Sequence, residues 1–348
     1  MSNQSTAGRK GLSLILLIAG VCLLVGALVL DFIGSPLAFR GPMLIIGAVG
    51  IIIGAYLFPT VKHHRKIINV LFLFPLLFTF AVTVIIPLVL GVFYSLTDWN
   101  GIRFNEFVGL ENYTSMFKEP AFIWSILITI LFVVFNMILV NVVGFLLALL
   151  CTSNLKGLGF FRASYFLPNL IGGIVLGYIW QFVFSRVFVN IGESTGWSLF
   201  EASWLSDPNK AFAAMVLVSV WQLSGYMILI YVAGFMGLSE DVMEAASIDG
   251  ASGWLKMRKI VLPLMMSSIT ICLFLTLSRA FMVYDVNLSL TAGGPYGTTE
   301  MAAMHVYEKA FTSRQFGAGQ AEALILFIVV ACISGLQVYL TKKQEVEA

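Results

Sequence analysis

Long apolar segments, almost free of charged residues, are the dominant feature of this chain of 348 residues. A helix that crosses the hydrocarbon core of a bilayer needs about 20 mainly apolar residues. Eight segments reach or nearly reach that length, at roughly 12–30, 42–58, 69–95, 122–150, 165–188, 212–236, 262–288 and 321–341. The shortest is the second, which lies between Pro42 and Pro59. We therefore predict an all-α integral membrane protein with about eight transmembrane helices.

The composition excludes several other classes of protein. Apolar residues make up 59% of the chain and charged residues 11%, whereas soluble domains have about 45–50% and about 25%. A soluble enzyme, a disordered chain and a nucleic-acid binder with a basic face are excluded, so the lipid bilayer is the expected surroundings. Neither a disulfide framework nor a metal site is predicted, because the cysteines form no spaced pairs and the adjacent His63 and His64 are a weak zinc signal.

The distribution of Lys and Arg predicts the orientation, since cytoplasmic loops carry the excess. Arg9 and Lys10 precede the first apolar run, as in a secretory signal, but that run is too long for a signal core and lacks a clear cleavage site. We expect a retained helix and both termini in the cytoplasm. Of the 20 basic residues, 12 then lie inside: Arg9, Lys10, Lys62, Arg65, Lys66, Lys156, Arg162, Lys256, Arg258, Lys259, Lys342 and Lys343.

One predicted cytoplasmic loop, residues 239–263, has a distinctive pattern. Ser239 is a candidate N-cap, followed by two acidic residues in the first turn of a helix. Met243, Ala246 and Ile248 give this helix an apolar side, and Gly250 can end it with a positive φ. A second short stretch then continues to Pro263. The pattern predicts a helix–turn–helix lying across the cytoplasmic face.

The same loop carries a family resemblance. The pattern E-A-A-x-x-x-G-x9-I-x-L-P resembles the loop signature of the membrane subunits of ABC importers. It is formed by Glu244, Ala245, Ala246, Gly250, Ile260, Leu262 and Pro263, and Asp249 with Ala251 makes it similar to the carbohydrate branch. Residues 107–113 (FVGLENY) and 290–295 (LTAGGP) also resemble sugar permeases. The order of elements is most similar to the larger, maltose-permease-type subunit, without that subunit's large insertion between spans three and four.

The resemblance implies a domain organisation and a mechanical role. Residues 65–348 are expected to form the six-helix core of a type I importer, and residues 1–64 to add two flanking helices. The loop 239–263 would be a coupling helix seated in a cleft of the ATP-hydrolysing subunit. Glu244 would then be its charged contact, Gly250 its turn, and Ala245 and Ala246 its close-packing face.

The resemblance also implies partners and a location. A second related permease, two ATP-binding subunits and an extracytoplasmic sugar-binding protein are expected, in the cytoplasmic membrane of a prokaryote. The chain has no G-x4-G-K-[ST] phosphate loop, so ATP is expected to be bound by the partner and no cofactor by this chain.

A polar stripe in the sixth apolar segment is the candidate solute path. Ser219, Gln222, Leu223 and Tyr226 follow the spacing i, i+3, i+4, i+7 and therefore share one helical face. Amide, hydroxyl and aromatic groups suit the hydroxyls and apolar ring faces of a sugar, and the matching stretch lines the sugar site in the maltose permease that the chain resembles. Hydrogen bonds between helices are the alternative use of such groups.

Two further segments contribute candidates for the path. Thr276 and Arg279 can share a face of the seventh segment, and an arginine at that depth needs a carboxylate, a carbonyl or water. Its partner could be Asp285, a second membrane subunit or the substrate. Asn169 follows Pro168 and can mark a helix break that lines the path, while the nearby glycines favour close helix packing.

Three other functions remain as alternatives. An importer for a polyamine or for a phosphodiester of the glycerol phosphate type would share the same loop. A membrane-embedded glycosyl- or lipid-modifying transferase would need Asp241, Asp249 or Asp285 as its acid or base, and a gated channel would need no ATP. No catalytic motif is present, so we expect the chain not to be an enzyme.

Overall fold

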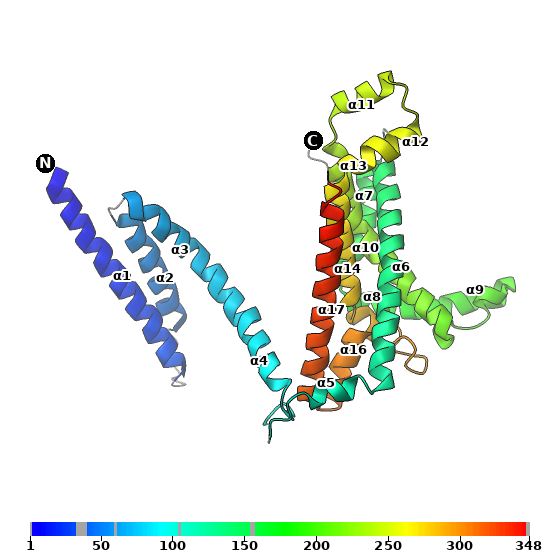
Figure 1. Ribbon diagram of the computed structural model, residues 1–348, viewed down its shortest axis with the longest axis horizontal. Helices are drawn as coiled ribbons and strands as arrows, with labels where there is room; N and C mark the ends of the chain where they lie inside the picture. The colour runs from blue at the N-terminus through cyan, green and yellow to red at the C-terminus, as the bar shows by residue number, and fades with distance from the viewer. Residues whose placement is uncertain (1, 33–39, 59–60, 104–105, 154–156, 346–348) are drawn as a thin grey trace. The chain divides into compact units, whose positions relative to one another are not determined.

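The computed structural model describes residues 2–32, 40–58, 61–103, 106–153 and 157–345. The chain forms two units, Met1–Leu90 and Gly91–Ala348, which are considered separately below. Within the described ranges every regular element is a helix, and the only strand-like feature is an isolated bridge between Thr97 and Phe107 (Figure 1). The all-α prediction is therefore confirmed.

The first unit is a helical hairpin followed by a third helix. Its elements are α1 (Ser2–Phe32), α2 (Arg40–Leu57), α3 (Val61–Phe80), η1 (Ala81–Ile85) and the first half of α4 (Ile86–Tyr94). Small residues bring α1 and α2 together: a Cβ on Gly20 would lie 2.7 Å from the carbonyl oxygen of Gly47. The Ser13 hydroxyl donates to the Gly54 carbonyl across the same interface. This is the close packing that small residues permit between helices in a membrane. The side chains of the basic cluster at 62–66 lie outside the described part of the chain.

The second unit is built around four long helices. In chain order its elements are α5 (Glu111–Met116), α6 (Pro120–Cys151), α7 (Leu158–Leu170), α8 (Gly173–Phe182), η2 (Val183–Val187), α9 (Phe188–Thr195), η3 (Ser198–Phe200), η4 (Trp204–Ser206), α10 (Pro208–Met236), α11 (Glu240–Ile248), α12 (Gly253–Lys256), η5 (Met257–Val261), α13 (Leu262–Leu264), α14 (Met266–Phe281), α15 (Asp285–Leu290), α16 (Ala302–Tyr307), η6 (Glu308–Thr312) and α17 (Phe316–Lys342). Helices α6, α10, α14 and α17 pack into a bundle. α11 and the chain's end lie at one end of this bundle, and α5 and α16 at the other (Figure 1).

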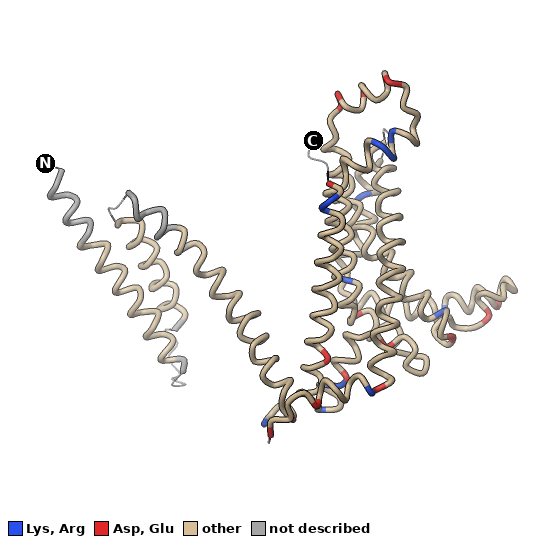
Figure 2. The backbone as a smooth tube through the Cα atoms, in the orientation of Figure 1, with Lys and Arg blue, Asp and Glu red and all other residues tan. Residues whose placement is uncertain are grey.

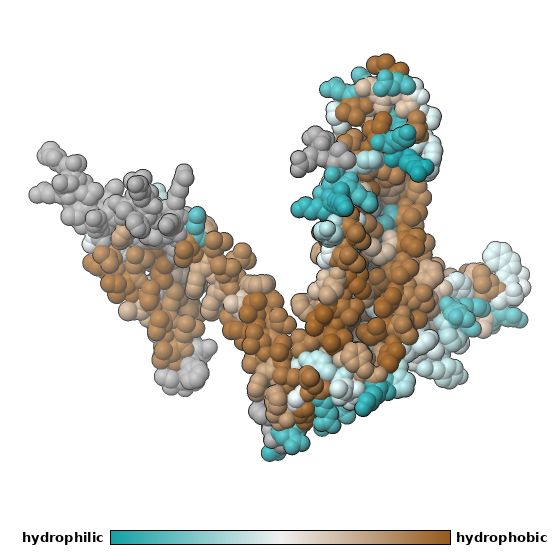
Figure 3. Space-filling model, in the orientation of Figure 1, coloured by the Kyte–Doolittle hydropathy of each residue, from teal (hydrophilic) through white to brown (hydrophobic). Residues whose placement is uncertain are grey.

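The surface of the second unit is a broad apolar band with polar groups toward its ends (Figure 3). Six helices of the described chain are long and apolar enough to cross a membrane, and a seventh span results if two bent segments count as one. Of the eight predicted segments, 42–58 corresponds to Gly41–Leu57, an apolar helix shorter than a full span, and 262–288 counts as a span only if its two bent parts are taken together.

Two predicted spans are interrupted. The segment 165–188 breaks at Ile171 and Gly172, just after Pro168, and the candidate span there is Gly173–Thr195. The segment 262–288 bends by 71° between Gly253–Leu264 and Met266–Phe281. The bend is at Met265, whose ψ of 5° is not helical.

Polar residues tie the long helices together inside the bundle. The Ser219 hydroxyl of α10 donates to Asn136 Oδ1 of α6 at 2.6 Å. Asn141 of α6 accepts from the Tyr231 hydroxyl at 2.8 Å and donates to Thr276 Oγ1 of α14 at 3.3 Å. All five groups are buried, so the bonds satisfy polar atoms that would otherwise be stranded in an apolar interior.

Candidate solute pocket and coupling helix

A pocket of about 370 Å³ lies where α8, α10, the end of α14 and α15 meet. Four residues of the predicted path line it, namely Ser219, Gln222, Leu223 and Arg279. The sequence missed the rest of the wall, which is made of Gly173, Ser278, Met282, Val283, Tyr284, Asp285 and Val286. The end of α14 and the turn that follows it therefore contribute as much as the predicted face of α10.

Arg279 brings three of the predicted residues together. Its Nη1 donates to Asn169 Oδ1 at 2.9 Å, and its Cζ lies 5.3 Å from the centre of the Tyr226 ring. The guanidinium thus joins the broken end of α7 to α14 and stacks over an aromatic ring of α10. Among the described residues no ion pair joins Arg279 to Asp285, although both line the pocket. The partner that the structure supplies for Arg279 is therefore the side-chain amide of Asn169, which was not among the partners expected from the sequence.

Thr276 does not belong to the pocket. Its side chain is fully buried, donates to the Cys272 carbonyl at 2.8 Å and accepts from Asn141. Thr276 therefore points to the interface with α6, and its part in the solute path stays a prediction. Ser219 is also largely buried and bonded to Asn136, so it both lines the pocket and joins α10 to α6.

Two glycines of α8 set how closely this helix approaches α15. A Cβ on Gly177 would lie 1.9 Å from Ser289 Oγ, and one on Gly173 would lie 2.7 Å from the Cβ of Asp285. Neither position can hold a larger residue without moving α15. The expected role of these glycines in close packing is confirmed, and it fixes Asp285 at the pocket wall.

The predicted helix of the 239–263 loop is α11, and its C-terminal end is well defined. Gly250 has φ = +74°. The amide of Gly250 donates to the Ser247 carbonyl and that of Ala251 to the Ala246 carbonyl, which is the Schellman pattern. At the other end Glu240 and Asp241 occupy the first turn as expected, but the Ser239 side chain makes no capping hydrogen bond.

The faces of α11 differ in part from the prediction. Glu244, Ala245 and Asp249 are exposed, whereas Ala246 is buried. The two alanines therefore do not form one packing face, and only Ala245 is open to a partner. Ile248, expected to share an apolar side with Met243 and Ala246, is 85% exposed. Figure 2 shows acidic residues along α11 and basic residues in the neighbouring α12 and η5.

Lys256 connects the two short helices of this loop. Its Nζ donates to the Met243 carbonyl at 2.7 Å and to the Ser247 hydroxyl at 2.9 Å. A cavity of about 1140 Å³ lies between α11 and the ends of α6 and α10, and Glu244 and Lys256 are in its wall. Ile260, Leu262 and Pro263 lie in η5 and α13, at the entry to α14, rather than beside α11. The loop is therefore a braced projection that continues directly into a long helix of the bundle.

A broken-helix bundle with a polar pocket and a projecting helix is the architecture of an importer's membrane subunit. The family model for the binding-protein-dependent transport system inner membrane component matches residues 142–346. The chain belongs to this family: it is a multi-pass permease subunit of an ABC importer, and it is not an enzyme. The transferase and channel alternatives are thereby set aside.

Named relatives and a solved structure agree with this assignment. The chain is 43% identical over 279 residues to the probable starch degradation products transport system permease protein AmyD of Thermoanaerobacterium thermosulfurigenes, covering 80% of this chain and 94% of that protein. It is 33% identical over 261 residues to the multiple sugar-binding transport system permease protein MsmF of Streptococcus mutans, covering 75% and 90%. A crystal structure of a bacterial alginate ABC transporter, in complex with an alginate pentasaccharide-bound periplasmic protein, has a similar fold. Its TM-score is 0.70 at 18% identity, over 81% of this chain and 96% of that chain.

Proposed function

We propose that this permease subunit translocates a sugar or an oligosaccharide delivered by an extracytoplasmic binding protein. The observation that carries the proposal is the 43% identity to AmyD along 80% of the chain. MsmF, the second relative, is also named for sugar transport.

The chemistry of the pocket supports a neutral, hydroxyl-rich solute. Ser219, Gln222, Ser278, Arg279 and Asp285 offer hydroxyl, amide, guanidinium and carboxylate groups to one small space. Sugar hydroxyls both donate and accept hydrogen bonds, so they can use every one of these groups. An anion such as a phosphodiester would meet Arg279 favourably but would lie close to the carboxylate of Asp285. A polyamine would be attracted by the carboxylate of Asp285 but would lie close to the guanidinium of Arg279.

Uptake into proteoliposomes tests the proposal. The chain, its companion permease and their ATP-binding subunits are reconstituted, and radiolabelled maltotriose, glycerol 3-phosphate or spermidine is offered with the binding protein. We expect ATP-dependent accumulation of maltotriose or of another oligosaccharide in the same series. Accumulation of glycerol 3-phosphate or spermidine, with no sugar taken up, would replace the proposal by one of the alternative importers.

We further propose that α11 is the coupling helix and that it docks against an ATP-binding subunit. Glu244, Ala245 and Asp249 are its accessible contacts, and the turn at Gly250 sets the direction of the chain that returns to α14. ATP is bound by the partner, and α11 supplies the mechanical connection between that subunit and the helices of this chain. A second related permease and a second ATP-binding subunit complete the transporter.

We propose that the α11 end of the second unit faces the cytoplasm, because basic residues gather there. Lys256, Arg258, Lys259, Lys342 and Lys343 belong to the elements at that end. Cysteine labelling tests this in a background with the exposed Cys22 and Cys332 replaced by alanine.

Two highly exposed positions serve as reporters: Ile248 on α11 and Tyr296 in the loop before α16. A membrane-impermeant maleimide should label Tyr296→Cys on intact cells and Ile248→Cys only after permeabilisation. The opposite pattern would reverse the orientation.

A further inference from the structure

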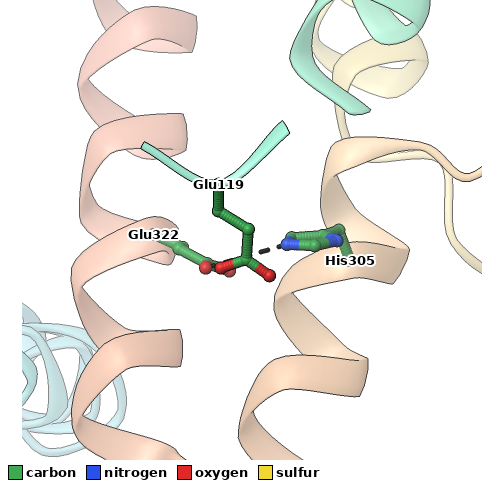
Figure 4. A group of neighbouring side chains, drawn as sticks. All are labelled: Glu119, His305 and Glu322. Atoms are coloured by element: carbon green, nitrogen blue, oxygen red, sulfur yellow. Dashed lines mark ion pairs between the residues drawn. The ribbon is translucent and has the colours of Figure 1, made fainter. Parts of the chain in front are cut away.

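Three titratable side chains from distant parts of the sequence meet at the end of the bundle opposite α11. Glu119 immediately precedes α6, His305 lies in α16 and Glu322 lies near the start of α17 (Figure 4). One oxygen or nitrogen atom from each lies within 4.8 Å of the other two. Within the group, His305 Nε2 and Glu322 Oε1 are 3.7 Å apart.

The atoms that face one another in this group have no hydrogen-bond partner among the described residues. Both carboxylate oxygens of Glu322 and the Nε2 of His305 are buried and make no hydrogen bond, and the contact between them is the ion pair at 3.7 Å. The side chain of Glu322 is fully buried and that of His305 is 8% exposed. A buried carboxylate that accepts no hydrogen bond is strongly unfavourable, since nothing replaces the water that it has lost. Some ligand must compensate it.

The other atoms of the group are already held in place. His305 Nδ1 lies 2.7 Å from Glu300 Oε1, and Lys309 Nζ donates to Glu119 Oε2 at 2.6 Å. A histidine that bonds a carboxylate through one ring nitrogen and leaves the other free has the arrangement usual for a metal ligand, because the second carboxylate fixes the tautomer and the ring. One oxygen of Glu119 is also left for a ligand.

We propose that Glu119, His305 and Glu322 form a binding site for a divalent transition-metal ion, best represented by Zn²⁺. One imidazole and two carboxylates are ordinary zinc ligands, with bond lengths of about 2.0–2.2 Å, so two ligand atoms on a tetrahedral ion lie about 3.4 Å apart. The 3.7 Å between His305 Nε2 and Glu322 Oε1 is close to that separation. A water molecule completes the coordination.

The charge of this group of side chains and its access from solvent both suit a cation. Among the described residues, Lys309 pairs with Glu119, and His305 contacts Glu300 and Glu322. Three carboxylates thus stand against one ammonium group and one imidazole, so the group attracts positive charge. Glu119 is 34% exposed in its side chain, and it therefore gives an ion a route from solvent to the buried pair. The bound ion would fasten the start of α6 to α16 and α17.

A proton is the competing occupant of the same site. Burial lowers the pKa of His305, but the hydrogen bond with Glu300 and the charges of Glu322 and Glu300 outweigh burial and raise it overall. The test must therefore count metal ions directly. The assembled transporter in lipid nanodiscs is stripped with EDTA, loaded with Zn²⁺ and dialysed, and its zinc content is measured by mass spectrometry.

Three variants and one control distinguish this site from adventitious binding. We expect about one zinc per chain in the wild type and at least tenfold weaker binding in both Glu322→Gln and His305→Gln. Glu300→Gln, which removes only the support of the imidazole, should weaken binding about 10–100-fold. The control is His63→Ala/His64→Ala, which removes the other two histidines of the chain and should bind zinc as the wild type does.

Glu322→Gln retains the size of the side chain and removes its charge, so assembly of the variant is expected and is checked by co-purification of the subunits. X-ray absorption at the zinc edge should show one imidazole among oxygen ligands. A wild type that retains no zinc would overturn the proposal. Zinc binding as tight as that of the wild type in both Glu322→Gln and His305→Gln would also overturn it. The group would then be interpreted as a site that binds a proton.

Discussion

The guanidinium of Arg279 donates to the side-chain oxygen of Asn169 at 2.9 Å, and this bond joins α14 to the end of α7. Arg279 lines the pocket, and Asn169 bonds it from a separate helix. Each residue is close to an irregularity in the backbone: Asn169 precedes the break at Ile171, and Arg279 precedes the end of α14. Arg279 is exposed, so its remaining donors are open to a solute. A solute that forms a hydrogen bond with the guanidinium would therefore contact a side chain that connects both helices.

Arg279→Gln should weaken solute binding during transport. A hydrogen bond to a charged group contributes about 1.5–3 kcal/mol, so we expect the KM for oligosaccharide uptake to rise about tenfold or more. The measurement is initial uptake against solute concentration in proteoliposomes. The matched control is Arg186→Gln, which removes the other arginine of a candidate span, one that does not line the pocket. An unchanged KM in Arg279→Gln would assign Arg279 a purely structural role.

Gly250→Ala should loosen the end of α11 and reduce coupling. A residue with a Cβ costs about 1–2 kcal/mol in the left-handed conformation that Gly250 adopts at φ = +74°. We expect faster hydrogen exchange in α11 and fewer solute molecules transported per ATP hydrolysed. Gly253→Ala is the control, because this glycine begins α12 and a Cβ there meets open space. Equal transport by both variants would contradict a role for the turn.

Lys256→Met should free α11 from α12 while retaining the length of the side chain. The change removes the bonds to the Met243 carbonyl and the Ser247 hydroxyl, each of which contributes about 1 kcal/mol. Hydrogen exchange should accelerate in α11 and leave α6 and α10 unchanged. The same substitution at the exposed Lys259, three residues further along, provides the comparison. If hydrogen exchange in α11 is equally fast in the two variants, Lys256 does not hold α11 against α12.

Gly225→Ala should separate α10 from α7. A Cβ at this position would lie 1.9 Å from the backbone oxygen of Tyr165, which cannot move aside as a flexible side chain would. Overpacking of this kind costs about 1–3 kcal/mol, so we expect a lower thermal unfolding midpoint and less assembled complex. Gly335→Ala in α17 is the control, since a Cβ at that position would meet no atom within 4 Å. A Gly225→Ala variant as stable as Gly335→Ala would show that α7 can shift at little cost.

Local sequence patterns predicted the features that depend on neighbouring residues. The first-turn acids and the positive φ at Gly250 define α11, and all of these lie within a dozen residues. The break after Pro168 follows in the same way from one proline and two glycines. The apolar length of each segment was sufficient to predict an all-helical membrane protein, although length alone did not reveal which segments are short or bent.

Features that depend on distant residues were not predictable from one sequence. The spacing of Thr276 and Arg279 correctly puts them one turn apart, but it does not reveal that Asn141 of α6 draws Thr276 into the core. Asn169 becomes the partner of Arg279 only after α7 breaks and packs beside α14. Glu119, His305 and Glu322 carry no local motif, since each comes from a different element.

The central claim is that α11 docks against the ATP-binding subunit. Its most direct test is a site-specific cross-link from α11 to that subunit. Ala245→Cys, in a chain whose exposed Cys22 and Cys332 are replaced by alanine, is reacted with a short bifunctional maleimide in the reconstituted transporter. The account predicts that the ATP-binding subunit is captured and that ATP changes the yield, while Tyr296→Cys at the other end of the bundle captures none. Capture of the ATP-binding subunit by Tyr296→Cys, with none by Ala245→Cys, would contradict it.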